Sequence, residues 1–399
     1  MPWSQTSPMD QKVRFIADYQ RDLFTIAELC DRYGISRKTG YKWIERYEAE
    51  GPTGLHDLSR RPHGCPHQTP SEVTEVLLEA RRRHPRWGAK KLLKIVSRRH
   101  PRWEWPARST ACEILKRHGL VPKAWRRPRL GHPGRPATLM QAPNQIWTAD
   151  FKGQFRTRDG LYCYPLTVVD GYSRFLLACQ GLLSTKHSDS RPVFLRLFQE
   201  HGLPKIIRTD NGVPFATRAL GRLSLLSVWW IRLGIYPELI EPAHPEQNGR
   251  HERMHRTLKA ETTHPPGGNL SSLQRRFNQF RKEYNYERPH EALDQETPAS
   301  KYHPSARQMP RQLPLIDYPA HYEVRLVSRN GGIRWNHQWV NVTHTLGGEY
   351  VGLEEVDNDL WDVYFGPLKL GRLDERTLRI EDHLGRTQRR RKVLPMSPD

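Results

Sequence analysis

Three acidic residues lie where carboxylates from distant parts of the chain could meet. Asp150 is near the end of a strand-like segment, residues 146–151; Asp210 follows another and opens an Asp-Asn-Gly turn; Glu252 lies on a helical segment after loop 245–249. Carboxylates brought together repel one another and raise each other's pKa unless cations lie between them. Oxygen ligands with open positions suit Mg²⁺ or Mn²⁺. Two such ions about 4 Å apart could stabilise the attacking and leaving oxygens of an in-line phosphoryl displacement.

The elements that must position these acids alternate between strand and helix. The pattern predicts strands over residues 146–151, 161–169, 175–179, 205–209 and 235–240, with a helix before the fourth and an amphipathic segment, 220–232, before the fifth. Short turns favour antiparallel pairing of the first three strands, and a helical crossover favours parallel pairing of the fourth. This order predicts a ribonuclease-H-like α/β core with a mixed sheet, in which the strands ending at Asp150 and Asp210 are neighbours. Asp170, in an Asp-Gly turn between two strands, is interpreted as structural.

Clusters of Pro and Gly divide the rest of the chain into further parts. The fold is therefore predicted to be multidomain: all-α helix-turn-helix units, the α/β core, and a small β-barrel. The predicted parts are a helix-turn-helix domain over residues 1–60, a second helical DNA-binding domain over 68–122, a basic linker over 123–143, the catalytic core over 144–300, the small antiparallel β-barrel over 318–382 and a basic tail over 383–399.

The first domain has the capping residues and the helix-ending glycine that are typical of a helix-turn-helix. Thr25 and Glu28 form a capping-box pattern, the helix they open ends at Gly34, and Ser36 can cap the next helix. The exposed face of that helix carries three basic residues that could reach base edges or phosphates: Arg37, Lys38 and Lys42. The alternative is a small helical bundle with a solvated basic face.

The net charge of the chain, +21, is unevenly distributed. Residues 81–135 contain 18 Lys or Arg against two acids. A cationic field of this size attracts polyanions and releases their counterions, so nucleic acid is the first partner to consider. The linker arginines Arg126, Arg127 and Arg129 could follow a phosphate backbone; the alternative is a solvated spacer.

Composition also excludes several classes of protein. No segment approaches the roughly 18 uninterrupted apolar residues of a membrane span, so no membrane association is expected. The N-terminus lacks a secretory pattern, which favours an intracellular, cytoplasmic location. The five cysteines are odd in number and never two residues apart, so neither a disulfide framework nor a Cys-paired zinc site is indicated.

The motifs around the three acids resemble those of the DDE transposase and retroviral integrase superfamily, and in particular bacterial insertion-sequence transposases with an integrase catalytic core. The segments that carry the resemblance are Trp147 to Asp150, Asp170 to Arg174, Thr209 to Gly212, His244 to His255, and Tyr284 to Leu293. The resemblance is strong over the core and weak over the C-terminal part. It implies that Asp150, Asp210 and Glu252 are the catalytic residues and hold two Mg²⁺ or Mn²⁺ ions.

A second glutamate, Glu246, is the alternative to Glu252 as the third acid. The family's usual spacing, counted from Asp210, ends at Glu246, but family members place an Asn-Gly or Gln-Gly pair shortly before the Glu, which selects Glu252. Arg256 and Lys259 follow on the same helical face as Glu252, and the resemblance implies that they hold phosphates of a DNA end. The alternative is ordinary surface pairing with Glu252 or Glu261.

The sequence therefore predicts a DNA transposase that cuts the 3′ ends of an insertion sequence and joins them to target DNA. The partners expected are double-stranded DNA, both terminal repeats and target, and further copies of the chain on that DNA. Two alternatives remain: a DNA-binding regulator that keeps the fold without catalysis, and a metal-dependent nuclease that cleaves without joining.

Overall fold

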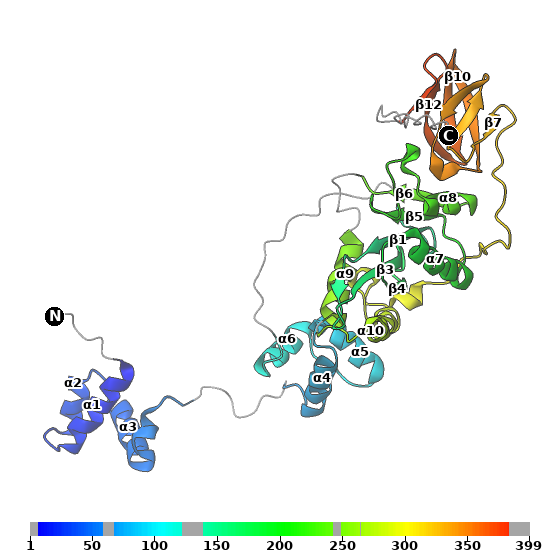
Figure 1. Cartoon of the computed structure of the whole chain (residues 1–399). Coiled ribbons are helices and arrows are strands. Elements are labelled where there is room, and N and C mark those ends of the chain that lie inside the picture. The colour runs from blue at the N-terminus through cyan, green and yellow to red at the C-terminus, as the bar shows by residue number, and fades with distance from the viewer. Residues whose placement is uncertain (1–6, 59–67, 122–138, 242–248, 264, 383–399) are drawn as a thin grey trace. The chain divides into compact units, whose positions relative to one another are not determined.

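The structure is a computed structural model that describes residues 7–58, 68–121, 139–241, 249–263 and 265–382 (Figure 1). By its internal contacts the chain divides into two compact units, residues 1–70 and 71–399. Within the described ranges, none of the helices combines the length and apolar character that a membrane crossing requires.

The first unit is helical. It consists of α1 (Pro8–Gln20), α2 (Ile26–Arg32), α3 (Arg37–Glu50) and a 3₁₀ turn, η1 (Gly51–Leu55). Thr25 and Glu28 form the predicted capping box at the start of α2, and the Ser36 side chain caps α3. Phe15, Leu29 and Trp43 meet in a core that all three helices share. The helix-turn-helix order predicted from the caps is confirmed.

The second unit begins with three more helices, α4 (Ser71–Arg83), α5 (Ala89–Arg99) and α6 (Arg108–Arg117). Leu77, Leu92 and Leu115 are buried in their common core. Ser109 does not cap the third of these helices, because α6 begins at Arg108 and Ser109 already lies in its first turn. A residue inside the helix cannot adopt the extended backbone of a cap.

These helices are joined to the central part by charged contacts. His84 Nδ1 lies 3.1 Å from Glu283 Oε1, and Arg98 donates to Glu296 over 2.6 Å. Lys94 pairs with the same Glu296 at 3.2 Å. The basic face of α5 thus binds acidic side chains of the segment that follows the central helices.

The central part is built on a mixed sheet with the strand order β2-β3-β1-β5-β6, in which β4 also pairs with β3. β1 pairs antiparallel with β3 and parallel with β5, and β5 pairs parallel with β6. The predicted ribonuclease-H-like order is confirmed, with one short addition, β2, that the pattern does not reveal. The strands are β1 (Ile146–Phe151), β2 (Phe155–Arg156), β3 (Tyr162–Asp170), β4 (Leu176–Leu182), β5 (Ile206–Thr209) and β6 (Tyr236–Leu239).

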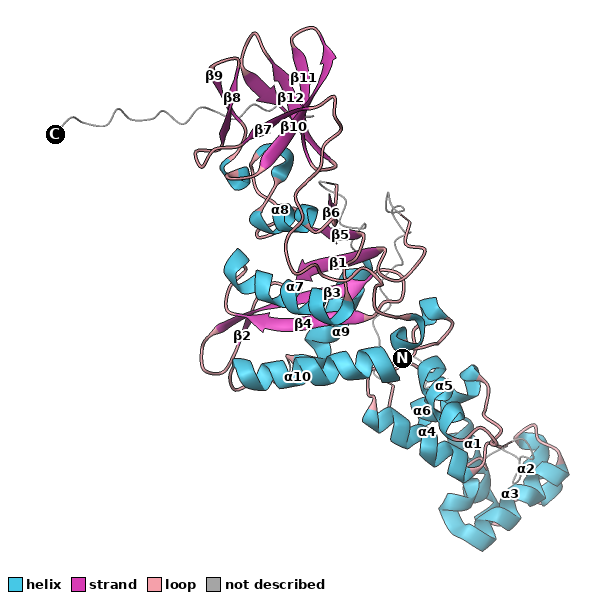
Figure 2. Ribbon diagram, turned by 90° about the vertical axis from the view of Figure 1, so that its right-hand side faces the viewer, coloured by secondary structure: helices cyan, strands magenta, loops and turns pink. Residues whose placement is uncertain are grey.

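Helices cover both faces of this sheet (Figure 2). On one face, α7 (His187–His201) and α8 (Leu225–Arg232) pack on Trp147 and its neighbours. On the other face, α9 (Gly249–Thr262) and α10 (Leu270–Lys282) form a separate core with residues of β3 and β4. Trp229 and Trp230 of α8 are buried in the core on the first of these faces. Short helical turns complete this part: η2 (Leu220–Arg222), η4 (Glu283–Glu287), η5 (Glu291–Leu293) and η6 (Pro298–Lys301).

The C-terminal part does not confirm the predicted β-barrel. Its described strands form an open five-stranded antiparallel sheet, β13-β12-β11-β10-β7, and a separate hairpin, β8-β9. Alternating residues identify strands, but closing a barrel depends on which distant edges pair, and no local pattern encodes that. The elements are β7 (Glu323–Leu326), β8 (Gly332–Trp335), β9 (Gln338–Asn341), η7 (His344–Leu346), β10 (Tyr350–Asp357), β11 (Leu360–Phe365), β12 (Leu368–Asp374) and β13 (Arg379–Glu381).

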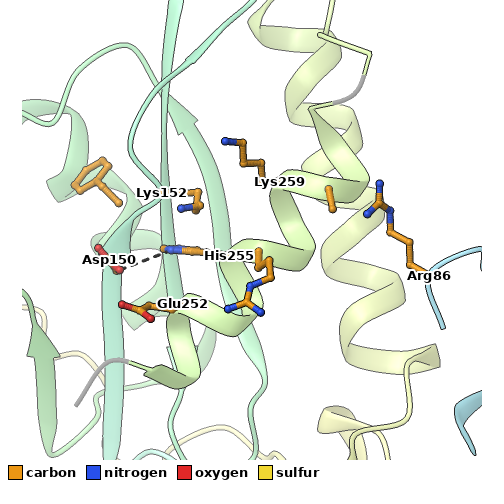
Figure 3. Close-up of a pocket in the computed structure, with 9 residues that line it drawn as sticks. Arg86, Asp150, Lys152, Glu252, His255 and Lys259 are labelled. Carbon is orange, nitrogen blue, oxygen red and sulfur yellow. Dashed lines mark ion pairs between the residues drawn. The ribbon is translucent and has the colours of Figure 1, made fainter. Parts of the chain in front are cut away.

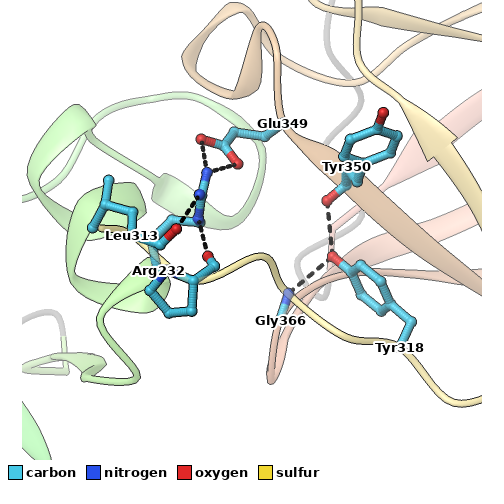
Figure 4. A network of polar contacts seen from close by, with 7 residues as sticks. Arg232, Leu313, Tyr318, Glu349, Tyr350 and Gly366 are labelled. Atoms are coloured by element: carbon cyan, nitrogen blue, oxygen red, sulfur yellow. Dashed lines mark hydrogen bonds and ion pairs between the residues drawn. The ribbon is translucent and has the colours of Figure 1, made fainter. Parts of the chain in front are cut away.

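These sheets share a hydrophobic core with η2 and α8, through side chains that include Leu223 and Ile231. A polar junction lies beside that core (Figure 4). Arg232, at the end of α8, donates through one nitrogen to both carboxylate oxygens of Glu349, at 2.8 and 2.7 Å, and also to the carbonyl of Pro314. Tyr318 donates to the carbonyl of Tyr350 over 2.8 Å.

We expect Arg232→Ala to lower the free energy of unfolding by about 2 kcal/mol, because hydrogen bonds to charged groups are worth more than neutral ones. Urea denaturation of the full chain would measure the effect. A double-mutant cycle with Glu349→Gln should give a coupling energy of about 1 kcal/mol or more. Additive effects of the two substitutions would contradict an energetic link at this junction.

Candidate active site

Asp150 and Asp210 lie at the ends of adjacent parallel strands. In the register of β1 and β5, Ala149 is paired with Thr209, so the two aspartates are the next residues along neighbouring strands. Adjacent strands are separated by about 4.8 Å. The expectation that these strands are neighbours is confirmed, and it places the two carboxyl-bearing residues at one edge of the sheet.

The turn after β5 holds Asp210 by local hydrogen bonds. The Gly212 amide donates to Asp210 Oδ1 over 3.2 Å, and the Asn211 side chain donates to the carbonyl of Ile240 over 2.9 Å. Burial raises the pKa of Asp210, and the Gly212 hydrogen bond opposes that shift. A carboxylate desolvated in this way is stabilised by a cation close to it.

Glu252 does not come from the sheet; it lies on the first turn of α9. Met254 and Leu258 bury one face of α9 against the sheet and α10, while Glu252, Arg256 and Lys259 remain exposed. Glu252 is thus fixed by the packing of its helix and reaches the same side of β1 as Asp150 does.

A cavity of about 720 Å³ is lined by Asp150 and Glu252, whereas Asp210 is not among its lining residues. Figure 3 shows Asp150, Glu252 and His255 converging, with Lys152 and Lys259 nearby and Arg86 at the far side. Its lining combines two carboxylates with two arginine and two lysine side chains. This charge distribution suits a polyanion lying along a site for cations. The full lining is Arg86, Asp150, Phe151, Lys152, Glu252, His255, Arg256, Lys259 and Ala260.

A buried hydrogen-bond network lies directly behind Asp150. Thr167 Oγ1 is 2.6 Å from both His251 Nε2 and His255 Nε2 and 3.0 Å from the Asp150 carbonyl. His251 Nδ1 is 3.0 Å from Thr148 Oγ1. His255 Nδ1 lies 3.7 Å from Asp150 Oδ2. The network ties α9 to β1 and β3 at the position of the proposed metal ligands.

Burial favours the neutral form of both histidines. Burial lowers the pKa of His251 to about 3 and the pKa of His255 further, with a smaller contribution to the latter from nearby positive charge. Ligand atoms of Asp150, His251 and His255 lie within 4.8 Å of one another. Neutral imidazole is the form that can bind a metal ion.

His251 and His255 are not among the site residues predicted from the sequence. A signal for them exists, since residues 251–255 read His-Glu-x-x-His, which places two histidines on one face of a helix. In metalloproteases this spacing binds zinc through both imidazoles. Here both nitrogens of His251 contact threonine hydroxyls, so the pair does not form an open zinc site of that kind.

The other residues singled out in the sequence have different positions. Arg37, Lys38 and Lys42 are exposed on α3, where the Lys42 ammonium lies 5.0 Å from the centre of the Trp43 ring. Asp170 is fully buried at the end of β3 and lies outside the cavity lining. Four predicted residues, Arg126, Arg127, Arg129 and Glu246, fall outside the described residues, as does the basic tail.

Family models match several segments of the chain. Two models described as an integrase core domain match residues 140–245 and 233–298. A helix-turn-helix domain matches residues 11–63, and a homeodomain-like domain matches residues 39–121. The integrase matches together span the sheet, the three candidate acids and every cavity residue except Arg86.

Relatives are similar over the central part of the chain. A Gag-Pol polyprotein of baboon endogenous virus (strain M7) is 30% identical over 131 residues, which is 33% of this chain and 7% of the polyprotein. A 31.7 kDa protein of insertion element IS407 from Burkholderia multivorans (strain ATCC 17616 / 249) is 28% identical over 168 residues, covering 40% of this chain and 56% of that protein. The chain therefore spans little more than half the length of the insertion-element relative and a small part of the polyprotein. Among solved structures, the HTLV-2 integrase catalytic core in complex with magnesium has 17% identity and a TM-score of 0.33, over 41% of this chain and 98% of that one.

Proposed function

We propose that this chain, which belongs to the DDE transposase and retroviral integrase superfamily, is a DNA transposase that cleaves insertion-sequence ends and joins their 3′ hydroxyls to target DNA. The observation that carries the proposal is the placement of Asp150 and Asp210 at the ends of adjacent parallel strands, with Glu252 on the wall of the cavity that Asp150 lines. Cleavage and joining are the same reaction with different nucleophiles: water in the first and a 3′ hydroxyl in the second.

The three carboxylates fit divalent cations. They supply hard oxygen donors, and the half-buried Asp210 gains from a neighbouring positive charge. Asp150, Asp210 and Glu252 would hold two Mg²⁺ or Mn²⁺ ions, which when bound stabilise the charge on the attacking and leaving oxygens. The protein's own contribution is to fix the three ligands: the sheet positions the aspartates, and α9 positions the glutamate.

The cationic part of the cavity positions the DNA strand. Arg256 and Lys259 follow Glu252 on α9 and line the same cavity, together with Lys152 and Arg86. Cationic groups in one cavity suit contacts to the phosphates next to the scissile one. Because such contacts go to the backbone, the core can accept varied target sequences.

Sequence recognition belongs to the N-terminal helices in this proposal. Arg37, Lys38 and Lys42 are exposed on the second helix of a helix-turn-helix, which in this motif reads the major groove. The linker arginines Arg126, Arg127 and Arg129 add backbone contacts. Two element ends must be joined in one event, so several copies of the chain act together on DNA in the bacterial cytoplasm.

An assay of joining tests the proposal directly. Purified full-length protein with Mg²⁺ and pre-cut element ends should give joined products, and Asp150→Asn should remove them. Glu200→Gln, an exposed acid at the end of α7, is the matched control and should remain active. DNA binding without any nicking would favour the inactive regulator, and nicking without joining would favour the nuclease.

Arg256→Ala and Lys259→Ala are each expected to weaken DNA binding about equally for all sequences. Each substitution should lower the slope of log K against log salt concentration by about 1, because one phosphate contact is lost. Titrations at several salt concentrations would measure this slope. Lys205→Ala, an exposed lysine outside the cavity lining, should leave it unchanged. An unaltered slope in both cavity variants would exclude direct phosphate contacts by these residues.

A further inference from the structure

The hydroxyl of Thr167 determines which protons the two buried histidines carry. A hydroxyl has one proton to donate and can accept two hydrogen bonds. Thr167 Oγ1 has three partners: the Asp150 carbonyl, which can only accept, and one nitrogen of each histidine. All three contacts are satisfied in one arrangement, in which Thr167 donates to the carbonyl and both histidines donate from Nε2.

This arrangement fixes the other nitrogen of each ring, since a neutral imidazole carries a single proton. Nδ1 of His251 becomes an acceptor, and the Thr148 hydroxyl, which lies 3.0 Å from it and 3.3 Å from the Val169 carbonyl, can supply its hydrogen bond. Nδ1 of His255 also keeps a lone pair, but it faces Asp150 Oδ2 at 3.7 Å. The His255 side chain is only 4% exposed, so this lone pair is aimed into the site and away from bulk water.

Two acceptors that face each other without a proton between them attract a cation. A nitrogen and an oxygen bound to the same ion at about 2.1 Å each can be at most about 4.2 Å apart, and the observed 3.7 Å lies inside that limit. His255 is also one helical turn from Glu252, on the same wall of the cavity.

We propose that His255 is a direct ligand, through Nδ1, of the divalent ion bound by Asp150. The inference rests on the proposed function, because it assigns a further ligand to the same site. A site with one imidazole nitrogen among carboxylate oxygens favours first-row transition ions such as Mn²⁺ more than an all-oxygen site does. Thr167 and His251 act as positioning residues, since they fix the ring and tautomer of His255.

Electron spin-echo spectroscopy of bound Mn²⁺ tests this assignment without relying on activity. The probe is the full-length protein with Mn²⁺ alone. We expect modulation from a directly bound imidazole ¹⁴N, which changes when the protein is labelled with [¹⁵N]histidine. His255→Asn should abolish the modulation and lower the Mn²⁺ affinity by at least about tenfold, because loss of a ligand costs no less than loss of a partner behind it.

The comparison variant is His251→Asn, which removes a positioning residue but no proposed ligand; it should keep the modulation and lower the Mn²⁺ affinity no more than His255→Asn does. The wild-type spectrum alone decides the main point, even if a variant fails to fold. Mn²⁺ that binds in a manner dependent on Asp150 but shows no histidine coupling would overturn this inference and leave the proposed function standing. Mn²⁺ binding that is unaffected by Asp150→Asn would overturn the metal site itself. Coupling that survives in His255→Asn but disappears in His251→Asn would contradict the inference, because it would identify His251 as the ligand.

Discussion

Glu252→Gln should lower Mg²⁺-dependent joining of element ends by at least about 100-fold, because loss of a metal-binding carboxylate removes several kcal/mol of transition-state stabilisation. Glu246→Gln should retain most of the activity. The pair of substitutions decides between the two glutamates that the sequence offers as the third acid.

The geometry favours Glu252. It lies in the first turn of α9, close to Asp150 in the lining of the same cavity, and is followed there by Arg256 and Lys259. Gln keeps the shape of the side chain but replaces an anionic oxygen with an amide nitrogen, which cannot bind a cation. The substitution therefore removes the charge and one ligand atom while leaving the helix intact.

Thermal unfolding separates loss of a ligand from loss of fold. Glu252 is exposed, so its substitution should alter the free energy of unfolding by no more than about 0.5 kcal/mol. The reverse outcome, an inactive Glu246→Gln and an active Glu252→Gln, would mean that the third carboxylate comes from the loop before α9.

The relation of Asp150 to Asp210 was predictable from the sequence because it depends on strand order. Short turns and a helical crossover determine which strands can pair, and the observed pairing of β1 with β5 follows. The same reasoning locates Glu252 on a helix, since its neighbours Met254 and Leu258 recur at helical spacing and are buried. Both inferences depend on local sequence patterns, strand order and helical spacing, and the folded chain has the strands and the helix that these patterns predict.

The histidine network was not predictable in the same way. His251 and His255 acquire their role from Thr148 on β1 and Thr167 on β3, and which threonines face α9 depends on the register of the sheet. The pairing of the C-terminal strands has the same origin: alternation predicts strands, but the partner of β7 is β10, well beyond the adjacent hairpin. Contacts between distant segments are the part that local sequence does not specify.

Asp170→Ala should lower the free energy of unfolding by about 3 kcal/mol or more, since buried donors left without an acceptor cost about 1–3 kcal/mol each. Asp170 is fully buried. Its carboxylate accepts from the Asn144 amide over 2.7 Å, from the Ser173 amide over 2.8 Å and from the Ser173 hydroxyl over 2.6 Å. These bonds tie the start of β1 to the turn after β3, so the substitution weakens the sheet that positions Asp150.

Urea denaturation of the full chain would measure the loss, and the joining assay would be run below the unfolding transition. Ser173→Ala is the graded control: it removes one of the three donors and should cost about 1 kcal/mol. Activity per folded molecule should stay close to wild type in both variants, because Asp170 lies outside the cavity lining. Asp150→Asn should show the opposite pattern, with stability retained and joining lost. A stable but inactive Asp170→Ala would instead identify Asp170 as an acid of the reaction, and the turn after β3 would have to be considered part of the active site.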